Sequence, residues 1–307
     1  MSKENTAVTK KKIKRCKEDV VFDAACFIIL TLVLFVVAYP LYWVIISSIS
    51  APSAVSSGKV LLHPIGFTLK GYAEVFKNDQ VMRGFLNSLI ITFCGVMVNL
   101  IVTLPTSYAL SRSNFSGKKP ITIFYLITMF FGGGMIPTYL TIRNLHMIDT
   151  LWAMILPGAI SAWNVIMFVN FFKEIPASLR ESATIDGAGH VRILFAIVIP
   201  LSKALLATIA LFTIVGFWND YFNAMLYLDS TTKMPIQIFL RKILVNMEIN
   251  RGNTQDTDMS RLLDMINANP RTVKAAATII PIIPILCVYP FLQKYFTKGM
   301  MLGAVKA

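Results

Sequence analysis

The sequence predicts an all-α membrane protein with six transmembrane helices and both termini on the cytoplasmic side. Three observations lead to this fold class: 55% of the 307 residues are hydrophobic, only 15% are charged, and the apolar residues gather in long continuous runs. A soluble domain carries roughly 25% charged residues, and a disordered chain is rich in charge and poor in apolar residues. Both classes are therefore excluded. The net charge of +13 is better explained by basic loops beside a membrane than by a nucleic-acid-binding surface.

The predicted spans follow from the thickness of the bilayer, whose core of about 30 Å requires roughly 20 apolar residues in a helix. Segments that meet or approach this length are residues 21–48, 86–110, 121–142, 151–172, 201–226 and 273–296. The first run is too long for a cleaved signal peptide and no small-residue cleavage motif follows it, so we expect a retained helix. The third run contains Gly132, Gly133, Gly134 and Pro137, which membrane helices tolerate better than soluble helices do.

The distribution of Lys and Arg predicts the orientation. More than half of the 29 basic residues fall in the N-terminal tail, the C-terminal tail and two of the connections between spans. By the positive-inside rule these regions face the cytoplasm. The expected organisation is a basic cytoplasmic tail (1–20), a first transmembrane helix (21–48), an extracytoplasmic loop (49–85), a transmembrane core (86–296) that contains a cytoplasmic loop (173–200) and an extracytoplasmic loop (229–272), and a cytoplasmic C-terminal tail (297–307).

The cytoplasmic loop at 173–200 is longer than a connection between two spans requires. Pro176 can begin a helix, and Gly187 can end it in the left-handed conformation that glycine adopts at low cost. A second short helical run follows from about His190 and ends near Pro200. The loop is either an amphipathic hairpin at the membrane surface or a rigid lever moved by a soluble partner.

The extracytoplasmic loop at 229–272 begins with an amphipathic helix. Pro235 suits its first turn, and apolar residues from Ile236 to Met247 recur at the spacing of one helical face. A polar stretch, 250–269, follows. This loop is either a solvated segment with a helix on the membrane surface or a docking element for an outside protein.

No motif in the chain predicts catalysis, a cofactor or a metal ion. A phosphate-binding loop of the form G-x-x-x-x-G-K-[ST] is missing, since Gly117-Lys118-Lys119 has neither the upstream glycine nor the hydroxyl residue. The histidines His63, His146 and His190 lie far apart in the sequence, and the four cysteines are scattered. We expect any nucleotide hydrolysis to occur in a partner protein. This chain is expected to act by changing its conformation.

The loop at 173–200 resembles the EAA loop (EAA…G…I-x-L-P) of permease subunits of binding-protein-dependent ABC importers. Glu181-Ser182-Ala183, then Gly187, then Ile197-Val198-Ile199-Pro200 match the motif, with Ser182 and Ile199 as mild departures. Further stretches resemble the maltose-type carbohydrate permeases and, within them, an oligosaccharide subgroup. These are residues 136–139, 170–172, 185–188, 217–220 and 298–306.

This resemblance implies the ABC type I importer permease fold in a bacterial cell membrane, with membrane lipid around it. Nucleic acid is not expected as a partner, since basic loops explain the positive charge. The resemblance also implies a second homologous permease chain, two ATPase subunits, an extracytoplasmic solute-binding protein, and a sugar or oligosaccharide as substrate. The ATPase contact would be formed by Glu181, Ser182, Ala183, Asp186 and Gly187. By position, the segment at 247–270 would enter the binding protein, and the tail at 299–307 would reach the ATPase pair.

We expect the solute path where polar side chains interrupt the apolar spans, because contact between a polar side chain and lipid hydrocarbon is energetically unfavourable. The predicted path residues are Asn87, Trp218, Asn219, Asp220, Tyr221 and Asn223. Asn99 and Asn164 are further candidates, but hydrogen bonding between helices explains these two at least as well. Two alternatives are a permease for an amino acid or peptide and, less favoured, an ion-coupled secondary transporter, which would show internal repeats and a carboxylate in mid-span.

Overall fold

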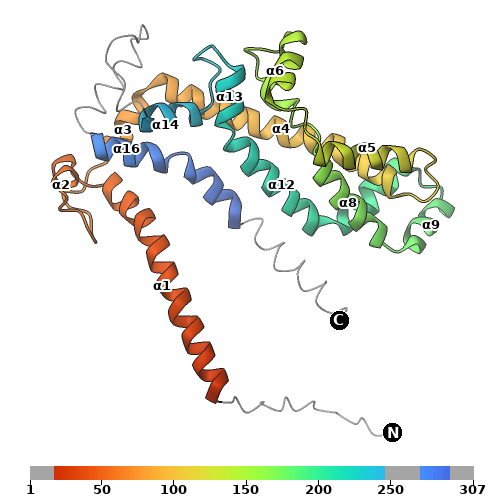
Figure 1. The fold of residues 1–307 in the computed structure, drawn as a ribbon, viewed down its shortest axis with the longest axis horizontal. Helices are drawn as coiled ribbons and strands as arrows, with labels where there is room; N and C mark the ends of the chain where they lie inside the picture. The colour runs from red at the N-terminus through yellow and green to blue at the C-terminus, as the bar shows by residue number, and fades with distance from the viewer. Residues whose placement is uncertain (1–16, 246–269, 291–307) are drawn as a thin grey trace.

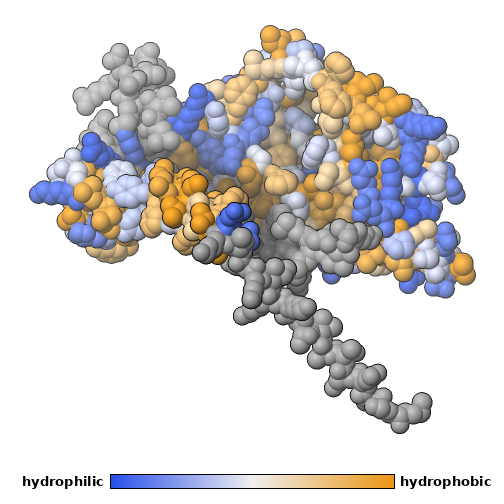
Figure 2. Space-filling model, turned by 60° about the horizontal axis from the view of Figure 1, so that its bottom comes forward, coloured by the Kyte–Doolittle hydropathy of each residue, from blue (hydrophilic) through white to orange (hydrophobic). Residues whose placement is uncertain are grey.

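The computed structural model describes residues 17–245 and 270–290, and every regular element in these ranges is a helix. Three helices there are long and apolar enough to cross a membrane, Glu18–Ser48, Asp79–Ser111 and Arg271–Pro290. Two further pairs of helices pass the same criterion but are bent by 117° and 85°, which brings the number of candidate spans to at most five in the described residues. Wide hydrophobic areas on the surface in Figure 2 agree with a protein that is embedded in lipid.

Helix α1 (Lys17–Ser48) projects away from the rest of the molecule (Figure 1). Its apolar side chains are exposed along most of its length, and its most apolar window buries nothing within this chain. Only its C-terminal end packs, against α16 (Pro270–Ile279) and close to α2 (Pro52–Ser56). The predicted span at 21–48 lies inside this helix, which is long and apolar enough to cross a membrane.

Helix α4 (Asp79–Ser111) is the central element and contacts α8, α12 and α14. Asn78 caps its first turn, since the Val81 amide donates to the Asn78 side chain over 3.1 Å. Small and polar residues form a buried stripe along one side of α4, namely Ser88, Thr92, Gly95, Asn99, Thr103 and Ser107. Small side chains let neighbouring helices approach closely in a membrane, and polar ones provide hydrogen bonds between helices.

The third predicted span is not one straight helix. Helix α5 (Lys118–Phe130) and helix α6 (Met135–Asn144) meet at an angle of 117°. Gly134 has φ +84°, a conformation that a helix cannot contain, and Pro137 lies in the first turn of α6. The glycine run that the sequence analysis accepted as a tolerated interruption therefore breaks the span.

The fourth and fifth predicted spans are also broken. The fourth consists of the short helix α7 (Trp152–Ile155) and helix α8 (Ala162–Glu174). The fifth consists of helix α12 (Lys203–Trp218) and helix α13 (Tyr221–Tyr227). Hydropathy does not register either break, because apolar residues continue on both sides of it.

The sixth predicted span is helical at Arg271–Pro290 with a turn at Ile280 and Pro281, and residues 291–296 lie outside the described part. The amphipathic helix expected after Pro235 is confirmed as α14 (Ile236–Val245). Its apolar side chains Ile236 and Phe239 are buried in a core cluster with residues of α16, and the Ile236 amide donates to the Ser88 hydroxyl of α4 over 2.9 Å. This helix packs on the protein core instead of lying on a membrane surface.

Candidate functional site

The loop at 173–200, here called the coupling loop, contains a helix that is closed by a left-handed glycine. Helix α9 (Ala177–Ile185) ends before Gly187, which has φ +80° as the sequence analysis expected. The Gly187 amide donates to the Thr184 carbonyl over 3.0 Å, and the Ala188 amide donates to the Ala183 carbonyl over 2.9 Å. These two bonds form a Schellman motif, which fixes the direction in which the chain leaves α9.

The second half of the coupling loop is anchored in the protein core. Helix α10 (His190–Ile193) continues into the π-helical turn η1 (Leu194–Val198) and helix α11 (Ile199–Leu201). Ile193, Leu194 and Val198 are buried against Phe168 and Phe172 of α8. The segment His190–Leu201 then meets α12 at a bend of 85°. The sequence analysis did not predict the π-helical turn.

Helix α9, in contrast, buries none of its residues and lies at the end of α4 that is remote from α3 (Lys70–Lys77) and α14 (Figure 1). The side chain of Ile185 is 86% exposed and that of Val191 is 71% exposed. Among the predicted contact residues, Glu181, Ser182, Asp186 and Gly187 are exposed, while Ala183 packs against the core cluster beneath the loop. The coupling loop therefore combines a rigid base with an unoccupied outer face.

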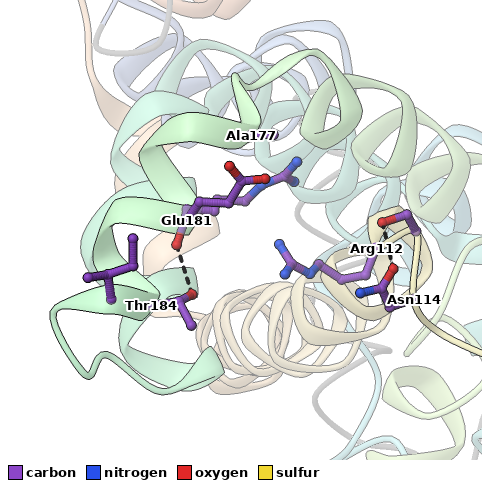
Figure 3. Close-up of a pocket in the computed structure, with 8 residues that line it drawn as sticks. Arg112, Asn114, Ala177, Glu181 and Thr184 are labelled. Carbon is purple, nitrogen blue, oxygen red and sulfur yellow. Dashed lines mark hydrogen bonds between the residues drawn. The ribbon is translucent and has the colours of Figure 1, made fainter.

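A cavity of about 500 Å³ separates α9 from the connection between α4 and α5. Figure 3 shows the guanidinium of Arg112 reaching into this space, with Glu181 on the opposite side. Arg180 also lines the cavity and donates to the Phe172 carbonyl over 3.4 Å. Two guanidinium groups and one carboxylate can bind polar and charged side chains of another protein. Arg112 lies in the connection between α4 and α5, whose basic residues the sequence analysis used only for orientation, and its position beside α9 was not predicted.

A second cavity, of about 320 Å³, lies between α4, α8 and α12. Its polar lining includes Asn99, Asn164, Ser161 and Asp220. The Asn99 amide donates to the Gly158 carbonyl over 3.0 Å, and the Asn164 amide donates to the Asn99 carbonyl oxygen over 3.4 Å. Both asparagines therefore form hydrogen bonds between segments of the chain, and both also line this cavity.

The structure does not gather the six predicted path residues in this cavity. Only Asp220 lines it, and its carboxylate also caps α13 by accepting from the Asn223 amide over 3.2 Å. Asn223 donates from its side chain to the same carboxylate over 2.8 Å. Asn219 and Tyr221 are exposed beside the cap.

Two of the predicted path residues, Trp218 and Asn87, have side chains that donate hydrogen bonds to backbone carbonyl groups of this chain. Trp218 is 3% exposed, and its indole donates to the Pro281 carbonyl over 3.0 Å at the turn in the last described span. Its ring therefore has no free face for a solute in this structure. Asn87 donates to the Thr232 carbonyl over 2.8 Å and to the Met234 carbonyl over 3.2 Å, so it holds the segment before α14.

A hydrogen-bonded ion pair joins two connections near this segment. Asp149, between α6 and α7, accepts from the Lys233 ammonium over 2.8 Å and from the Ser230 amide over 2.9 Å. The pKa of the Asp149 carboxyl is held well below its ordinary value, first by the Lys233 hydrogen bond and then by those from Ser230. The carboxylate thus fixes the connection between α13 and α14 against the connection between α6 and α7.

Asp149→Asn is expected to lower the midpoint of thermal unfolding in detergent by about 2–4 °C at pH 7, because about 1 kcal/mol is lost from a partly exposed ion pair. The folded pKa is lowered, so this contribution is present above the ordinary pKa of about 3.9 and disappears as the pH falls through the folded value. The difference between the two proteins should therefore be constant from pH 7 to 5 and shrink below pH of about 4. Asp229→Asn, an exposed neighbour, is the control. A deficit that grows on acidification would contradict the assignment.

Comparison with known proteins identifies the family. Residues 19–302 match the family described as binding-protein-dependent transport system inner membrane component. The polygalacturonan/rhamnogalacturonan transport system permease protein YtcP of Bacillus subtilis is 40% identical over 285 residues, which cover 93% of this chain and 98% of the relative. The maltodextrin transport system permease protein MdxG of the same organism is 28% identical over 294 residues, which cover 91% of this chain and 95% of the relative.

A solved structure shares the fold over nearly the whole length. A chain of a bacterial ABC transporter involved in the import of the acidic polysaccharide alginate matches with a TM-score of 0.84 and 33% identity, covering 93% of this chain and all of the other. The broken spans described above therefore occur within a known membrane fold. The chain belongs to the family of binding-protein-dependent transport system inner membrane components, and it is a multi-pass permease of the inner membrane that serves an ABC importer.

Proposed function

We propose that this chain and a second, homologous permease chain form the membrane path of an oligosaccharide importer. A solute-binding protein delivers the sugar on the outer side, and two ATPase subunits act on the coupling loops from the cytoplasm. The observation that carries this proposal is the construction of the coupling loop. Helix α9 buries no residue and is exposed to a partner, whereas the segment after Gly187 is packed into the core and leads directly into α12.

The proposed contact with the ATPase consists of Glu181, Ser182, Ala183, Asp186 and Gly187, extended by the exposed Ile185. Apolar side chains that are exposed on a rigid turn favour docking into a groove of another protein. Arg112 and Arg180 at the edge of the cavity beside α9 supply charge for acidic groups of that partner. The Schellman motif keeps the helix from yielding when the partner moves, so displacement of α9 is transmitted to the segment that follows it.

The proposed substrate class rests on two kinds of support. Relatives of this chain are named as permeases for polygalacturonan/rhamnogalacturonan, maltodextrin and galactooligosaccharides. The cavity at Asn99, Asn164 and Asp220 offers amide and carboxylate groups, which bind sugar hydroxyls. Trp218, Asn219, Tyr221 and Asn223 lie at the junction of α12 and α13, where movement of α13 would free the Trp218 ring. Asn87 lies on α4 beside the segment before α14 and is proposed to join the path from there.

The proposed topology keeps six spans with both termini in the cytoplasm. Each broken pair, α5 with α6, α7 with α8 and α12 with α13, is assigned to one crossing, and α9 then lies on the cytoplasmic side. The segment at 247–270 is proposed to meet the binding protein, and the tail at 299–307 is proposed to meet the ATPase pair. Residues 246–269 and 291–307 lie outside the described part of the chain.

Uptake by the assembled transporter in vesicles tests the proposal. Labelled neutral oligosaccharides, oligouronides, amino acids and peptides are supplied with the cognate binding protein and internal ATP. Saccharide uptake that requires ATP and the binding protein is the expected result. Uptake of an amino acid or peptide in place of a saccharide would overturn the substrate class, and uptake driven by an ion gradient alone would overturn the mechanism.

Asp220→Asn tests the path, because the amide oxygen can still cap α13 while the charge is lost. Uptake is expected to fall at least tenfold with an unchanged yield of the complex. Asp229→Asn, which removes an exposed carboxylate outside the cavity, should leave uptake unaltered. Equal uptake in the two variants would restrict Asp220 to its capping role.

A further inference from the structure

The turn after α2 has an unusual attachment to α1. Three successive carbonyl groups in it accept hydrogen bonds from three aromatic side chains near the end of α1. Trp43 donates to the Val60 carbonyl over 2.9 Å, Tyr42 donates to the Leu62 carbonyl over 2.6 Å, and Tyr39 donates to the Leu61 carbonyl over 3.3 Å. We call residues 60–63 the aromatic-bound turn.

The three donors place the aromatic-bound turn beside α1. Tyr39 and Trp43 are separated by one helical turn, so the three bonds hold the turn against α1 ahead of its C-terminal end. Side chains on a helix lean toward its N-terminus, which carries the tyrosine hydroxyls further from the C-terminal end of α1. Val60 is buried in a cluster with Ile46 and Val55, which keeps the turn against α1.

The depth of the turn in the membrane follows from α1. Asp23 is the last charged residue before an uncharged stretch that continues to Lys59. A bilayer core of about 30 Å takes roughly 20 helical residues, which places its far boundary near Trp43. Tyr39 and Tyr42 then lie at the level where aromatic residues border the hydrocarbon. Leu61 and Leu62, bonded to these hydroxyls, lie at the same level.

The chemistry of the turn fits that depth. Leu61 is 59% exposed and Leu62 is 68% exposed, so two large apolar side chains have no cover within the described part of this chain. Carbonyl groups that enter hydrocarbon must be bonded within the protein, and here Trp and Tyr side chains satisfy three in succession. Lys59 is exposed next to the turn, where its ammonium can reach lipid phosphates.

We propose that the aromatic-bound turn is a lipid-binding anchor, which inserts Leu61 and Leu62 into the bilayer interface at the C-terminal end of α1. Its partner is the phospholipid leaflet, with acyl chains against the two leucines and headgroup phosphates near Lys59. The anchor holds α2 and the segment that leads to α3 at a constant depth while the rest of the permease moves. This role depends on membrane insertion alone and is independent of the transported solute.

Spin-label accessibility in the complete transporter tests the anchor. Leu62→Cys and Phe67→Cys are labelled in a chain without other cysteines and reconstituted in phosphatidylethanolamine and phosphatidylglycerol vesicles. Phe67 is the matched control, because it is 72% exposed but lies next to Thr68, whose amide bonds the Ile49 carbonyl beyond the end of α1. At position 62 collisions with oxygen should exceed those with a water-soluble nickel chelate at least threefold, and at position 67 the ratio should be reversed.

Two results would overturn the proposal. Equal access of the nickel chelate to both positions would place the turn in water, and protection of position 62 from both reagents would mean that another protein chain covers it. A second variant tests the hydrogen bonds themselves: Tyr42→Phe combined with the label at position 62 should raise nickel access severalfold. Unchanged access would show that the aromatic side chains do not set the depth.

Discussion

Gly187→Val is expected to separate ATP hydrolysis from transport, reducing uptake at least tenfold while the chain still reaches the membrane in normal amount. The left-handed conformation at φ +80° costs a residue with a Cβ about 1–2 kcal/mol, and more when the side chain is β-branched. A Cβ at this position would meet nothing within 4 Å, so the effect is on the backbone and spares the packing of the core. The Schellman turn would open, and α9 would change direction relative to the anchored segment.

Gly189→Val provides a control two residues further on. Gly189 has φ −70° and ψ 164°, which suit valine, and it also has open space around it. Gly187→Asn should retain most of the uptake, because asparagine is the residue that best replaces glycine in the left-handed conformation. ATPase activity and uptake are measured together in vesicles. An equal ratio of uptake to ATP hydrolysis in Gly187→Val and Gly189→Val would contradict the proposed role of the coupling loop.

Gly95→Val is expected to cause the largest loss of folded protein. A Cβ at Gly95 would lie 2.7 Å from the Phe217 ring, and the same ring lies 2.7 Å from a Cβ at Gly158. The Phe217 ring is thus held between α4 and the connection before α8, with no space on either side. Overpacking of this kind costs about 1–3 kcal/mol or more, because α4 and α12 must separate. The amount of protein in the membrane and its unfolding temperature should both fall.

Phe217→Leu should partly restore the protein in combination with Gly95→Val, since a smaller side chain frees the required volume. Gly216→Val is the matched control, because this glycine precedes the same phenylalanine and nothing lies within 4 Å of its position. Additive losses in the double variant would show that the two residues do not interact as described. Membrane yield by immunoblot and thermal unfolding in detergent distinguish these outcomes.

The sequence predicted the elements whose signal is a continuous property of the chain. The ends of α1 at Ser48 and of α4 at Ser111 follow from long apolar runs, and the left-handed Gly187 follows from a glycine placed after a helical segment. Helix α4 begins at Asp79, inside the segment 49–85 that was expected to be a loop. The breaks within the other spans depend on single backbone angles or caps, such as Gly134 and Asp220, which a hydropathy average does not register.

The candidate site was less predictable because a polar residue near the end of a span has several uses. Trp218 and Asn87 carry the residue types expected of a sugar-binding path, but their donors are used by carbonyl groups of this chain. Asn99 and Asn164, which the sequence also explained by helix contacts, line the polar cavity together with Asp220. Sequence alone does not show which carbonyl group will lie opposite a given amide.

The bend of 85° between the segment His190–Leu201 and α12 has a mechanical consequence. The axis of the segment His190–Leu201 is nearly perpendicular to the axis of α12. A displacement of the segment along its own axis therefore moves α12 sideways and hardly along the length of α12. A piston-like stroke delivered to the coupling loop would therefore reach α12 as a sideways swing about the corner at Ser202. Such a sideways movement changes the width of the cavity between α12, α4 and α8. A movement of α12 along its own axis would leave that width unchanged.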